Sequence, residues 1–446
     1  MFTARFLRLV ALAGVSLAAV SAAAADAVQV ERLRRYNDAK FGMFIHWGPY
    51  SLASVEASWP IMRPGNWNIS EADYRALPRR FNPVKFDPKA WVQLAKDAGQ
   101  RYMVFTTKHH DGFCMFDSMY TDYKITNTPY KNDIVAMLAA AAREADMPLG
   151  FYYSPPDMNH PGFRDTSKLS SSNWNGEPSR PEWPLYLDYM ELQLRELLTR
   201  YGDIFLIWFD GLRQQEKYAG ARFHELIHSI QPRALINNRI GLTGDFVTPE
   251  QRLPKGIPVK GARVGATDPG DQGLTGAPPR PDEFQPWETC MTINKTWGYN
   301  KNDTDYKSRT DLIRALIDAA SKGGNFLLNV GPTPEGTIQP EFEERLRGMG
   351  VWLKTNGEAI YGTTYGPLQN LSFGRTTTKG KTVYLHVFDW PGPSIELTGL
   401  SAKVRSVRAL AGGATLRFQQ AAGKLTIDAA GVTPDPDATV LAIETR

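Results

Sequence analysis

Short apolar runs alternate with longer amphipathic segments along residues 41–332. The apolar runs are typical of strands that are buried on both faces in a parallel sheet. Some of the segments between them begin with Asp-Pro or Asn-Asp, which cap helices, and carry apolar residues at helical spacing. This alternation predicts a parallel sheet with helices outside it. The predicted strands cover residues 41–48, 101–110, 148–155, 204–211, 234–239 and 325–332, and helices are predicted over 87–99, 131–146 and 186–202.

A closed barrel fits this pattern better than an open sheet. The segment is long enough for eight strand–helix units, and no glycine-rich dinucleotide motif follows the first run. The pattern itself supplies six or seven strands, so closure with eight is an inference from length. We predict an α/β fold with a (β/α)8-like, TIM-type barrel over residues 26–361.

The pattern of apolar and polar residues changes near Gly362. Short alternating runs such as 382–390, 394–400 and 439–445 are separated by Gly, Pro and Asn. Alternation of this kind indicates antiparallel strands with one buried face, so we predict a small C-terminal antiparallel β-sandwich over residues 362–446.

One segment inside the barrel region has no periodicity. Residues 249–284 are rich in Pro and Gly, which predicts a long loop. Long loops in compact domains are usually functional, so we expect this loop to contribute to binding.

The first 25 residues have the features of a secretory signal peptide. Arg5 and Arg8 precede an apolar run from Leu9 to Val20, and small residues continue to Ala25. A membrane anchor is the alternative, but the run is short for a span of about 20 residues. We predict cleavage after Ala25, export to the periplasm or the medium, and no membrane association afterwards.

The composition mainly excludes certain classes of binding partner. A net charge of +4 over 446 residues gives no sign of binding to nucleic acid or an anionic membrane. The 11 tryptophans and 18 tyrosines suit sugar binding, because aromatic rings stack on the apolar faces of sugars. The two cysteines, Cys114 and Cys290, are too few for a disulfide scaffold or a zinc site. The sequence leaves open whether a disulfide joins them. We expect neither a cofactor nor a metal, and the oligomeric state is not indicated.

Ionisable residues directly follow several predicted strands. All strands of a parallel barrel end at one face, and that face holds the active site. Asp210 would therefore lie at this face, although a helix N-cap followed by Gly211 is the plain alternative. The other residues expected at the strand ends are His46, Trp47, His109, His110, Asp111, Tyr152, Tyr153, Asn238 and Arg239.

Three chemistries compete for such a site. A metal-dependent hydrolase is disfavoured because adjacent side chains of a strand, such as His109 and His110, point to opposite faces. A serine nucleophile lacks its G-x-S-x-G motif. A carboxylate nucleophile and a second carboxylic acid, surrounded by His, Tyr and Trp, are the equipment of a retaining glycosidase.

Eight motifs, in order along residues 39–361, connect the chain to a known family. They are "KFGMFIHWGPYS", "YMVFTTKHHDGFCMFDS", "GFYYSP", "IWFDG", "NNR", "GDFVTPE", "WETCMTINKTWGYN" and "GGNFLLNVGPTPEGTI". In these motifs the chain resembles α-L-fucosidases of glycoside hydrolase family 29, whose fold is a (β/α)8-like barrel followed by a β-sandwich. The resemblance implies an exo-acting hydrolase that releases terminal α-L-fucose from glycans by double displacement, through a covalent fucosyl-enzyme, without a cofactor.

The resemblance also implies roles for the matching residues. Asp210 corresponds to the nucleophile of the W-x-D-G motif, and Tyr152 is expected beside it. The 6-methyl group of fucose needs an apolar wall, for which Trp297 is the first choice and Phe44 or Trp59 are alternatives. The substrate-binding residues implied are His46, Glu56, Trp59, His109, His110, Tyr152, Arg239 and Trp297, of which Glu56 and Trp59 fit the family pattern only approximately.

Two glutamates compete for the role of general acid and base. In many family members this residue follows the arginine of the fifth strand closely, and Glu250 lies 11 residues after Arg239. Glu288, in "WETC", is the alternative, and it could instead be structural or orient another group. Either glutamate could also simply begin a helix.

Other functions stay open beside this hypothesis. The same scaffold could serve an enzyme that acts on α-L-galactosides or mainly transfers fucose, or a fucose-binding protein without turnover. Asp210 and a candidate acid speak against mere binding. The sandwich could bind glycans, although a structural role is expected from fold-level analogy. The natural glycan and its linkage cannot be read from these motifs.

Overall fold

The computed structural model describes residues 27–63, 65–163, 181–211, 215–261, 279–369 and 371–446. The signal peptide predicted over residues 1–25 lies outside them, as does the middle of the loop predicted over 249–284. Among the described residues, no helix is long and apolar enough to cross a bilayer. Cys114 and Cys290 are both free and buried.

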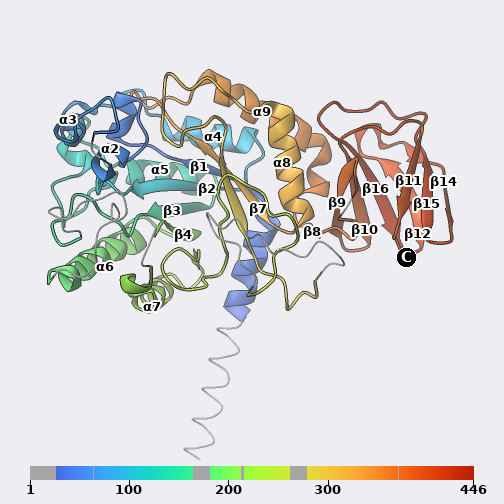
Figure 1. The fold of residues 1–446 in the computed structure, drawn as a ribbon, viewed down its shortest axis with the longest axis horizontal. Coiled ribbons are helices and arrows are strands. Elements are labelled where there is room, and N and C mark those ends of the chain that lie inside the picture. The colour runs from blue at the N-terminus through green and yellow to red at the C-terminus, as the bar shows by residue number, and fades with distance from the viewer. Residues whose placement is uncertain (1–26, 64, 164–180, 212–214, 262–278, 370) are drawn as a thin grey trace, which may run out of the picture.

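A seven-stranded parallel sheet forms the larger part of the molecule (Figure 1). Its strand order is β5-β4-β3-β2-β1-β7-β6, so the chain winds outward from β1 to β5, continues at β6 on the other edge, and returns to β7 beside β1. The strands are β1 (Phe41–Ile45), β2 (Tyr102–Lys108), β3 (Leu149–Tyr153), β4 (Leu206–Phe209), β5 (Leu235–Ile236), β6 (Glu288–Thr292) and β7 (Asn325–Val330).

The six apolar runs that predicted strands all form strands of this sheet. Only β6 was not recognised as a strand, because its sequence, ETCMT, mixes polar and apolar residues and lacks an apolar run. It is nevertheless buried along its whole length, because it lies between β7 and the segment that follows β5.

Residues 246–250 occupy the eighth position, between β5 and β6. Isolated parallel bridges join Phe246 to Asn237 on one side, and Val247 and Glu250 to Trp287 and Cys290 on the other. The sheet is thus closed by an irregular segment instead of a regular eighth strand. The prediction of a (β/α)8-like barrel is confirmed, with closure through this segment.

Alternate residues of each strand point into the barrel, because side chains alternate between the two faces of a strand. The interior cluster takes residues of the same parity from each strand, such as Leu206 and Trp208 of β4. Tyr36, from a helix over residues 27–39, belongs to the same cluster and closes the amino end of the barrel. The cluster is Tyr36, Phe44, Tyr102, Val104, Tyr152, Phe205, Leu206, Trp208, Leu235, Phe246, Cys290 and Leu327.

Helices surround the sheet, as predicted. Asp87 and Asp133 cap the helices that follow them by accepting backbone N–H groups, and Ser308 forms a capping box with Asp311. The helices are α2 (Trp59–Met62), α3 (Glu71–Ala76), α4 (Pro88–Asp97), α5 (Ile134–Glu144), α6 (Trp183–Arg200), α7 (Gly220–Ile230), α8 (Arg309–Ser321) and α9 (Pro340–Asn356).

The antiparallel region begins at β8 (Thr364–Tyr365), just after the last short helix of the barrel region, η6 (Gly357–Ala359). A six-stranded sheet of order β13-β12-β16-β10-β9-β8 and a three-stranded sheet of order β11-β15-β14 enclose an apolar core of their own. The strands are β9 (Gly374–Lys379), β10 (Thr382–Val387), β11 (Ser394–Thr398), β12 (Val404–Ala409), β13 (Thr415–Leu416), β14 (Phe418–Ala421), β15 (Lys424–Asp428) and β16 (Thr439–Thr445).

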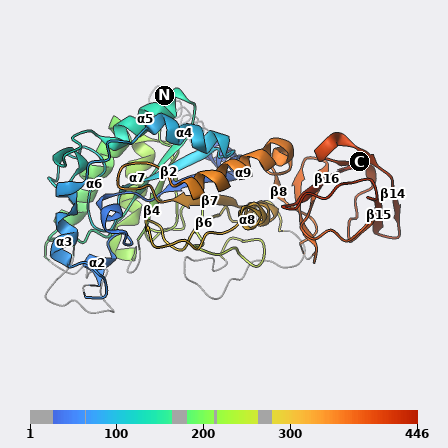
Figure 2. The same cartoon turned by 90° about the horizontal axis from the view of Figure 1, so that it is seen from above.

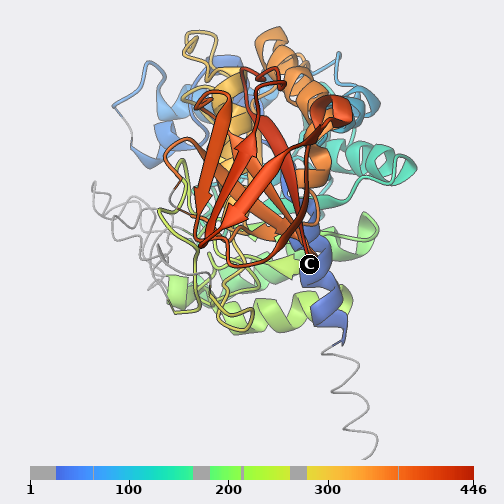
Figure 3. The ribbon, with the colours of Figure 1, turned by 90° about the vertical axis from the view of Figure 1, so that its right-hand side faces the viewer.

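Helix α8 lies between the parallel sheet and the sandwich (Figures 1 and 2), and it contacts β8 and β9. Asp318 of α8 accepts from Arg375 of β9 at 2.5 Å, and the sandwich therefore rests on the flank of the barrel. Figure 3 shows the sandwich in front of the barrel when the molecule is viewed from that side. No described residue of the sandwich lines the site described next.

Candidate active site

The carboxyl ends of the barrel strands surround a cavity whose empty space, including the part open to solvent, is about 490 Å³. Ten residues that the sequence analysis named for the site line it, and they come from strands, loops and the short helix α2, far apart in the chain. The whole set of described residues that line the cavity is Phe44, His46, Trp59, His109, His110, Tyr152, Trp208, Asp210, Arg239, Glu250, Cys290 and Trp297.

Asp210 follows β4 directly and has the parity of Leu206 and Trp208, so its side chain points into the barrel. Its Oδ1 accepts from Arg239 Nη1 at 2.8 Å and its Oδ2 accepts from the Tyr152 hydroxyl at 2.9 Å. Burial opposes its charge, but the Arg239 cation and the hydrogen bonds from Arg239 and Tyr152 outweigh burial and lower the pKa of Asp210. The carboxylate is therefore ionised near neutral pH.

Arg239 joins two carboxyl groups. Its Nη1 lies 2.8 Å from Asp210 Oδ1 and 3.0 Å from Glu250 Oε2. Thr248 accepts from its other nitrogens through the hydroxyl and the carbonyl oxygen, at 2.8 and 3.0 Å, and its guanidinium carbon lies 4.6 Å from the Trp208 ring centroid. These contacts fix the guanidinium between the two carboxyl groups.

Glu250 stands at the end of the segment that closes the barrel, opposite Cys290. Burial raises its pKa; Arg239 acts against this and the charge of Asp210 adds to it, so the pKa of Glu250 lies above its ordinary value. Its side chain is 30% exposed, compared with 14% for Asp210. One carboxyl group is thus kept charged and the other is biased toward its neutral form, which is the division of labour between a nucleophile and an acid.

Three histidine rings form one side of the cavity. Burial lowers the pKa of His46 and of His110 to about 4, and lowers the pKa of His109 well below its usual range. All three are neutral at physiological pH, and a neutral imidazole can donate one hydrogen bond and accept another. They can therefore bind the hydroxyl groups of a sugar.

Aromatic rings provide the apolar part of the cavity. The Trp297 ring lies 4.9 Å from the His46 ring and 6.1 Å from the Phe44 ring, centroid to centroid. Glu56 lies behind this wall instead of lining the cavity, and its Oε1 accepts from the Trp297 backbone N–H at 2.8 Å. Burial raises the pKa of Glu56 to about 7. Trp59 lines the cavity from α2.

Glu288 lies beneath the cavity. It is the first residue of β6, it is fully buried, and it accepts from the Tyr102 hydroxyl and from Trp208 Nε1, the latter at 3.1 Å. Burial raises its pKa to about 7, because both partners are neutral donors that only partly offset the loss of water. It does not line the cavity, whereas Glu250 does.

Several residues around the site were not predicted. Asn329 contacts His46, Ser154 contacts His110, and Thr248 holds Arg239. Strand parity could have identified Asn329, since it faces the same side of β7 as the interior residue Leu327. Thr248 gave no such signal, because it belongs to an irregular segment.

His109, His110 and Asp210 are close enough to hold a metal ion, with one ligand atom from each lying within 4.8 Å of the others. The fit is poor, because the Arg239 guanidinium already pairs with Asp210 at 2.8 Å and would repel a cation. The same cluster suits a neutral ligand with many hydroxyl groups.

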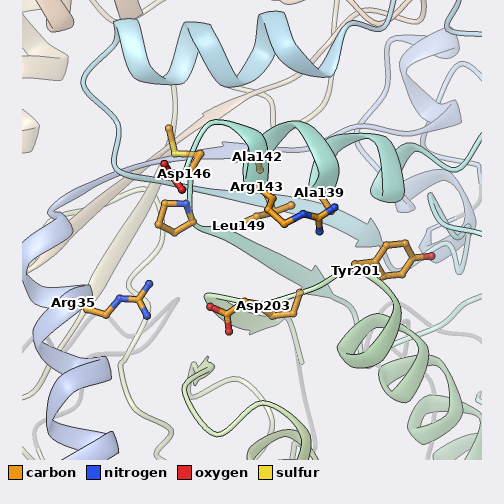
Figure 4. Close-up of a pocket in the computed structure, with 11 residues that line it drawn as sticks. Arg35, Ala139, Ala142, Arg143, Asp146, Leu149, Tyr201 and Asp203 are labelled. Carbon is orange, nitrogen blue, oxygen red and sulfur yellow. The ribbon is translucent and has the colours of Figure 1, made fainter.

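A second cavity lies at the opposite end of β3 and β4 (Figure 4). Arg35, Arg143, Asp146 and Asp203 surround it, and Leu149, the first residue of β3, marks its position at the amino ends of the strands. Active sites of parallel barrels lie at the carboxyl ends, so this cavity is not the candidate site.

A closed parallel barrel with paired carboxyl groups among histidines and aromatic rings at its carboxyl face defines the class of glycoside hydrolases. The profile of the α-L-fucosidase family matches residues 16–358, and the chain belongs to this family, glycoside hydrolase family 29.

Relatives and solved structures agree with this assignment. The chain is 30% identical to an α-L-fucosidase of Branchiostoma floridae, over 87% of this chain and 86% of that protein, and 32% identical to the human plasma α-L-fucosidase, over 80% and 76%. It is similar to the structure of α-L-fucosidase isoenzyme 1 from Paenibacillus thiaminolyticus, with a TM-score of 0.81 and 36% identity over 94% of this chain and all of that one. A trapped covalent intermediate of a family 29 α-L-fucosidase from Bacteroides thetaiotaomicron has a TM-score of 0.77 and 27% identity, over 93% and 96%.

Proposed function

We propose that the protein is an exo-acting, retaining α-L-fucosidase in which Asp210 is the nucleophile and Glu250 the general acid and base. The observation that carries this proposal is the contact of both carboxyl groups with one nitrogen of Arg239, at 2.8 and 3.0 Å. Two oxygens held in this way are no more than about 6 Å apart. Retaining glycosidases separate their carboxyl groups by about 5–5.5 Å, and inverting ones by about 6.5–9.5 Å.

The reaction follows from the two protonation states. Ionised Asp210 attacks the anomeric carbon while the bond from that carbon to the aglycone oxygen breaks, and Glu250 gives its proton to the departing oxygen. Glu250 then removes a proton from water, the water oxygen attacks the same carbon, and Asp210 leaves. Two successive inversions release fucose with its original configuration.

The walls of the cavity support fucose as the sugar. Neutral His46, His109 and His110 suit its ring hydroxyl groups, and Trp297 with Phe44 forms an apolar surface for its methyl group. The Bacteroides thetaiotaomicron intermediate was trapped with 2-fluoro-fucosyl fluoride in a Glu→Gln mutant of that enzyme. A covalent intermediate and a glutamate at the second step agree with the roles proposed for Asp210 and Glu250.

The first test is hydrolysis of 4-nitrophenyl α-L-fucoside, with proton NMR of the first sugar released. We expect turnover and the α-anomer before mutarotation. Initial release of the β-anomer would contradict retention, and no turnover by the folded protein would favour a binding protein. The corresponding α-L-galactoside carries a hydroxymethyl group in place of the methyl group, and we expect it to react about tenfold to a hundredfold more slowly, since an apolar wall rejects an added hydroxyl only modestly.

Azide assigns the two carboxyl groups separately. In Glu250→Ala, azide can attack the fucosyl-enzyme from the side of the departed aglycone, and we expect α-fucosyl azide. In Asp210→Ala, azide can occupy the place of the missing carboxylate, and we expect the β-azide. The opposite assignment of products would exchange the two roles, and α-azide from Glu288→Ala alone would make Glu288 the acid and base.

We also propose export after cleavage behind Ala25, which rests on the sequence of the first 25 residues alone. The N-terminal sequence of protein recovered from the periplasm or the medium would begin at Asp26. Retention of the intact N-terminus in the membrane fraction would favour the anchor.

A further inference from the structure

Each histidine of the cavity has a side-chain oxygen behind its ring. A neutral imidazole carries a single ring proton, so the nitrogen that faces this oxygen determines what the other nitrogen can do toward a ligand. If the rear nitrogen donates, the front nitrogen can only accept. The contacts are His46 Nδ1 to Asn329 Oδ1 at 2.7 Å, His109 Nδ1 to Ser58 Oγ at 2.9 Å, and His110 Nδ1 to Ser154 Oγ at 2.5 Å.

The direction of the His46 bond is fixed by a third group. Asn329 Nδ2 donates to the Trp297 carbonyl oxygen at 2.7 Å, and a carbonyl oxygen can only accept. The amide oxygen of Asn329 must therefore be the atom that faces His46, and it too can only accept. The proton of the His46 ring accordingly lies on Nδ1, and Nε2 is left without one.

The direction of the His110 bond is fixed in the same way. The Ser154 hydroxyl has one proton, and its oxygen lies 2.5 Å from the Pro156 carbonyl oxygen, which can only accept. That proton therefore lies between these two oxygens, and Ser154 can only accept from His110 Nδ1. The bare Nε2 of His110 lies 3.4 Å from Asp210 Oδ2, so two acceptors face each other where a hydroxyl proton of the substrate would be favourable.

His109 differs from its two neighbours. In the part of the chain that the structure describes, its partner Ser58 makes no second side-chain hydrogen bond that would orient the hydroxyl. A serine hydroxyl can rotate to donate or to accept. The His109 ring is thus free to carry its proton on either nitrogen.

We propose that Asn329 and Ser154 are positioning residues that hold His46 and His110 in the Nδ1–H tautomer, so that both present an unprotonated Nε2 to the sugar. Two hydroxyl groups of the substrate must then donate, while the one that meets His109 can donate or accept. The identity of the ligand as a fucoside rests on the proposed function. The tautomers themselves do not, because they follow from the groups behind the rings.

The tautomers can be read directly from the wild-type protein. Nitrogen-15 NMR of protein enriched in labelled histidine distinguishes a protonated from an unprotonated ring nitrogen, and the His46→Asn and His110→Asn variants assign the signals. We expect both rings to show protonated Nδ1 and bare Nε2 at pH 7, and His109 to show a mixture. A protonated Nε2 on His46 or His110 would overturn the proposal, whether or not the protein turns over fucosides.

A matched pair of serine deletions separates positioning from mere packing. Ser154→Ala should move the His110 proton to Nε2, where it can donate to Asp210, and lower kcat/KM about tenfold to a hundredfold. Ser58→Ala deletes the same group behind His109 and should cost less. Equal losses with an unchanged His110 tautomer would refute the positioning role. The expected spectrum with no wild-type turnover would instead refute the proposed function.

Discussion

Two neighbouring layers of the barrel interior each hold a glutamate, and they treat it in opposite ways. In the cavity, Glu250 pairs with the Arg239 cation at 3.0 Å and its side chain is 30% exposed. In the layer beneath, Glu288 is fully buried, and its side-chain donors among the described residues are the neutral Tyr102 and Trp208. The first can exchange protons with a ligand and water, and the second is sealed from both.

The distance along the strand that separates these two environments is small. Glu288 begins β6, and Cys290, two residues further on, already stands opposite Glu250 at the floor of the cavity. A carboxyl group becomes chemically useful here only where the strands end and a cation and an opening are both available. The comparison therefore supports the proposal that Glu250 is the acid and base and that Glu288 has a structural role.

The largest effect is expected at the proposed nucleophile. Asp210→Ala removes the group that we propose forms the covalent intermediate, and kcat should fall by about three to five powers of ten. The control is Asp428→Ala, which removes an exposed carboxylate of the sandwich, and far-UV circular dichroism checks that both proteins are folded. Near-normal turnover by Asp210→Ala would contradict the proposed role of Asp210 as the nucleophile and leave it a structural role.

The two glutamates should separate when the leaving group is varied. Glu250→Gln should lose about 10²–10³-fold in kcat/KM for a sugar or alkyl aglycone and much less for 2,4-dinitrophenyl, which leaves without protonation. Glu288→Gln should show the same loss, or none, with both substrates. Steady-state kinetics on the two series measures this, and a leaving-group dependence confined to Glu288→Gln would reverse the comparison.

The pH dependence of activity should follow from the same two groups. In the proposed mechanism the active form has Asp210 ionised, with its pKa lowered chiefly by Arg239 against burial, and Glu250 protonated, with its pKa raised by burial and Asp210. We expect kcat/KM to rise with pH as Asp210 ionises and to fall as Glu250 ionises. In Glu250→Gln the alkaline fall should disappear while the acid limb remains. An alkaline limb that survives in this variant would point to another acid.

The smallest effect on activity, but a distinct effect on stability, is expected from Glu288. Its pKa is raised from 4.5 to about 7 in the folded protein, so the folded state holds this proton more tightly than the unfolded state. The contribution of Glu288 to stability should therefore fall as pH rises from about 4.5 to 7 and then level off, with a span of about 3 kcal/mol. Urea unfolding at pH 5 and pH 7.5 covers most of this span, and Glu288→Gln should reduce the difference between the two unfolding free energies. An unchanged pH dependence of the unfolding free energy in the variant would contradict the raised pKa and the buried environment of Glu288.

The sequence predicted the fold where each strand contains an apolar run. The runs that contain β1, β2, β4 and β7 are buried on both faces and could hardly be anything else in a parallel sheet. The sequence did not predict β6 and the closing segment 246–250 as strands. Their polar residues face the interior network and the cavity, so the apolar run that marks the other strands is missing.

The site was predictable where chemistry coincides with a strand end, as for Asp210, His46 and Tyr152. The groups behind them, such as Asn329, Ser154 and Thr248, were not, because their importance depends on contacts between segments far apart in the chain. Glu56 shows the same limit: it was expected at the substrate, and the structure places it behind Trp297.

The most direct test of the account is the covalent attachment of the sugar. Wild-type protein would be incubated with 2-fluoro-fucosyl fluoride, digested and analysed by mass spectrometry. The account predicts a 2-fluorofucosyl adduct on the peptide that contains Asp210, and its absence from Asp210→Ala. An adduct on Glu250 or Glu288, or turnover of 4-nitrophenyl α-L-fucoside without any adduct, would contradict it.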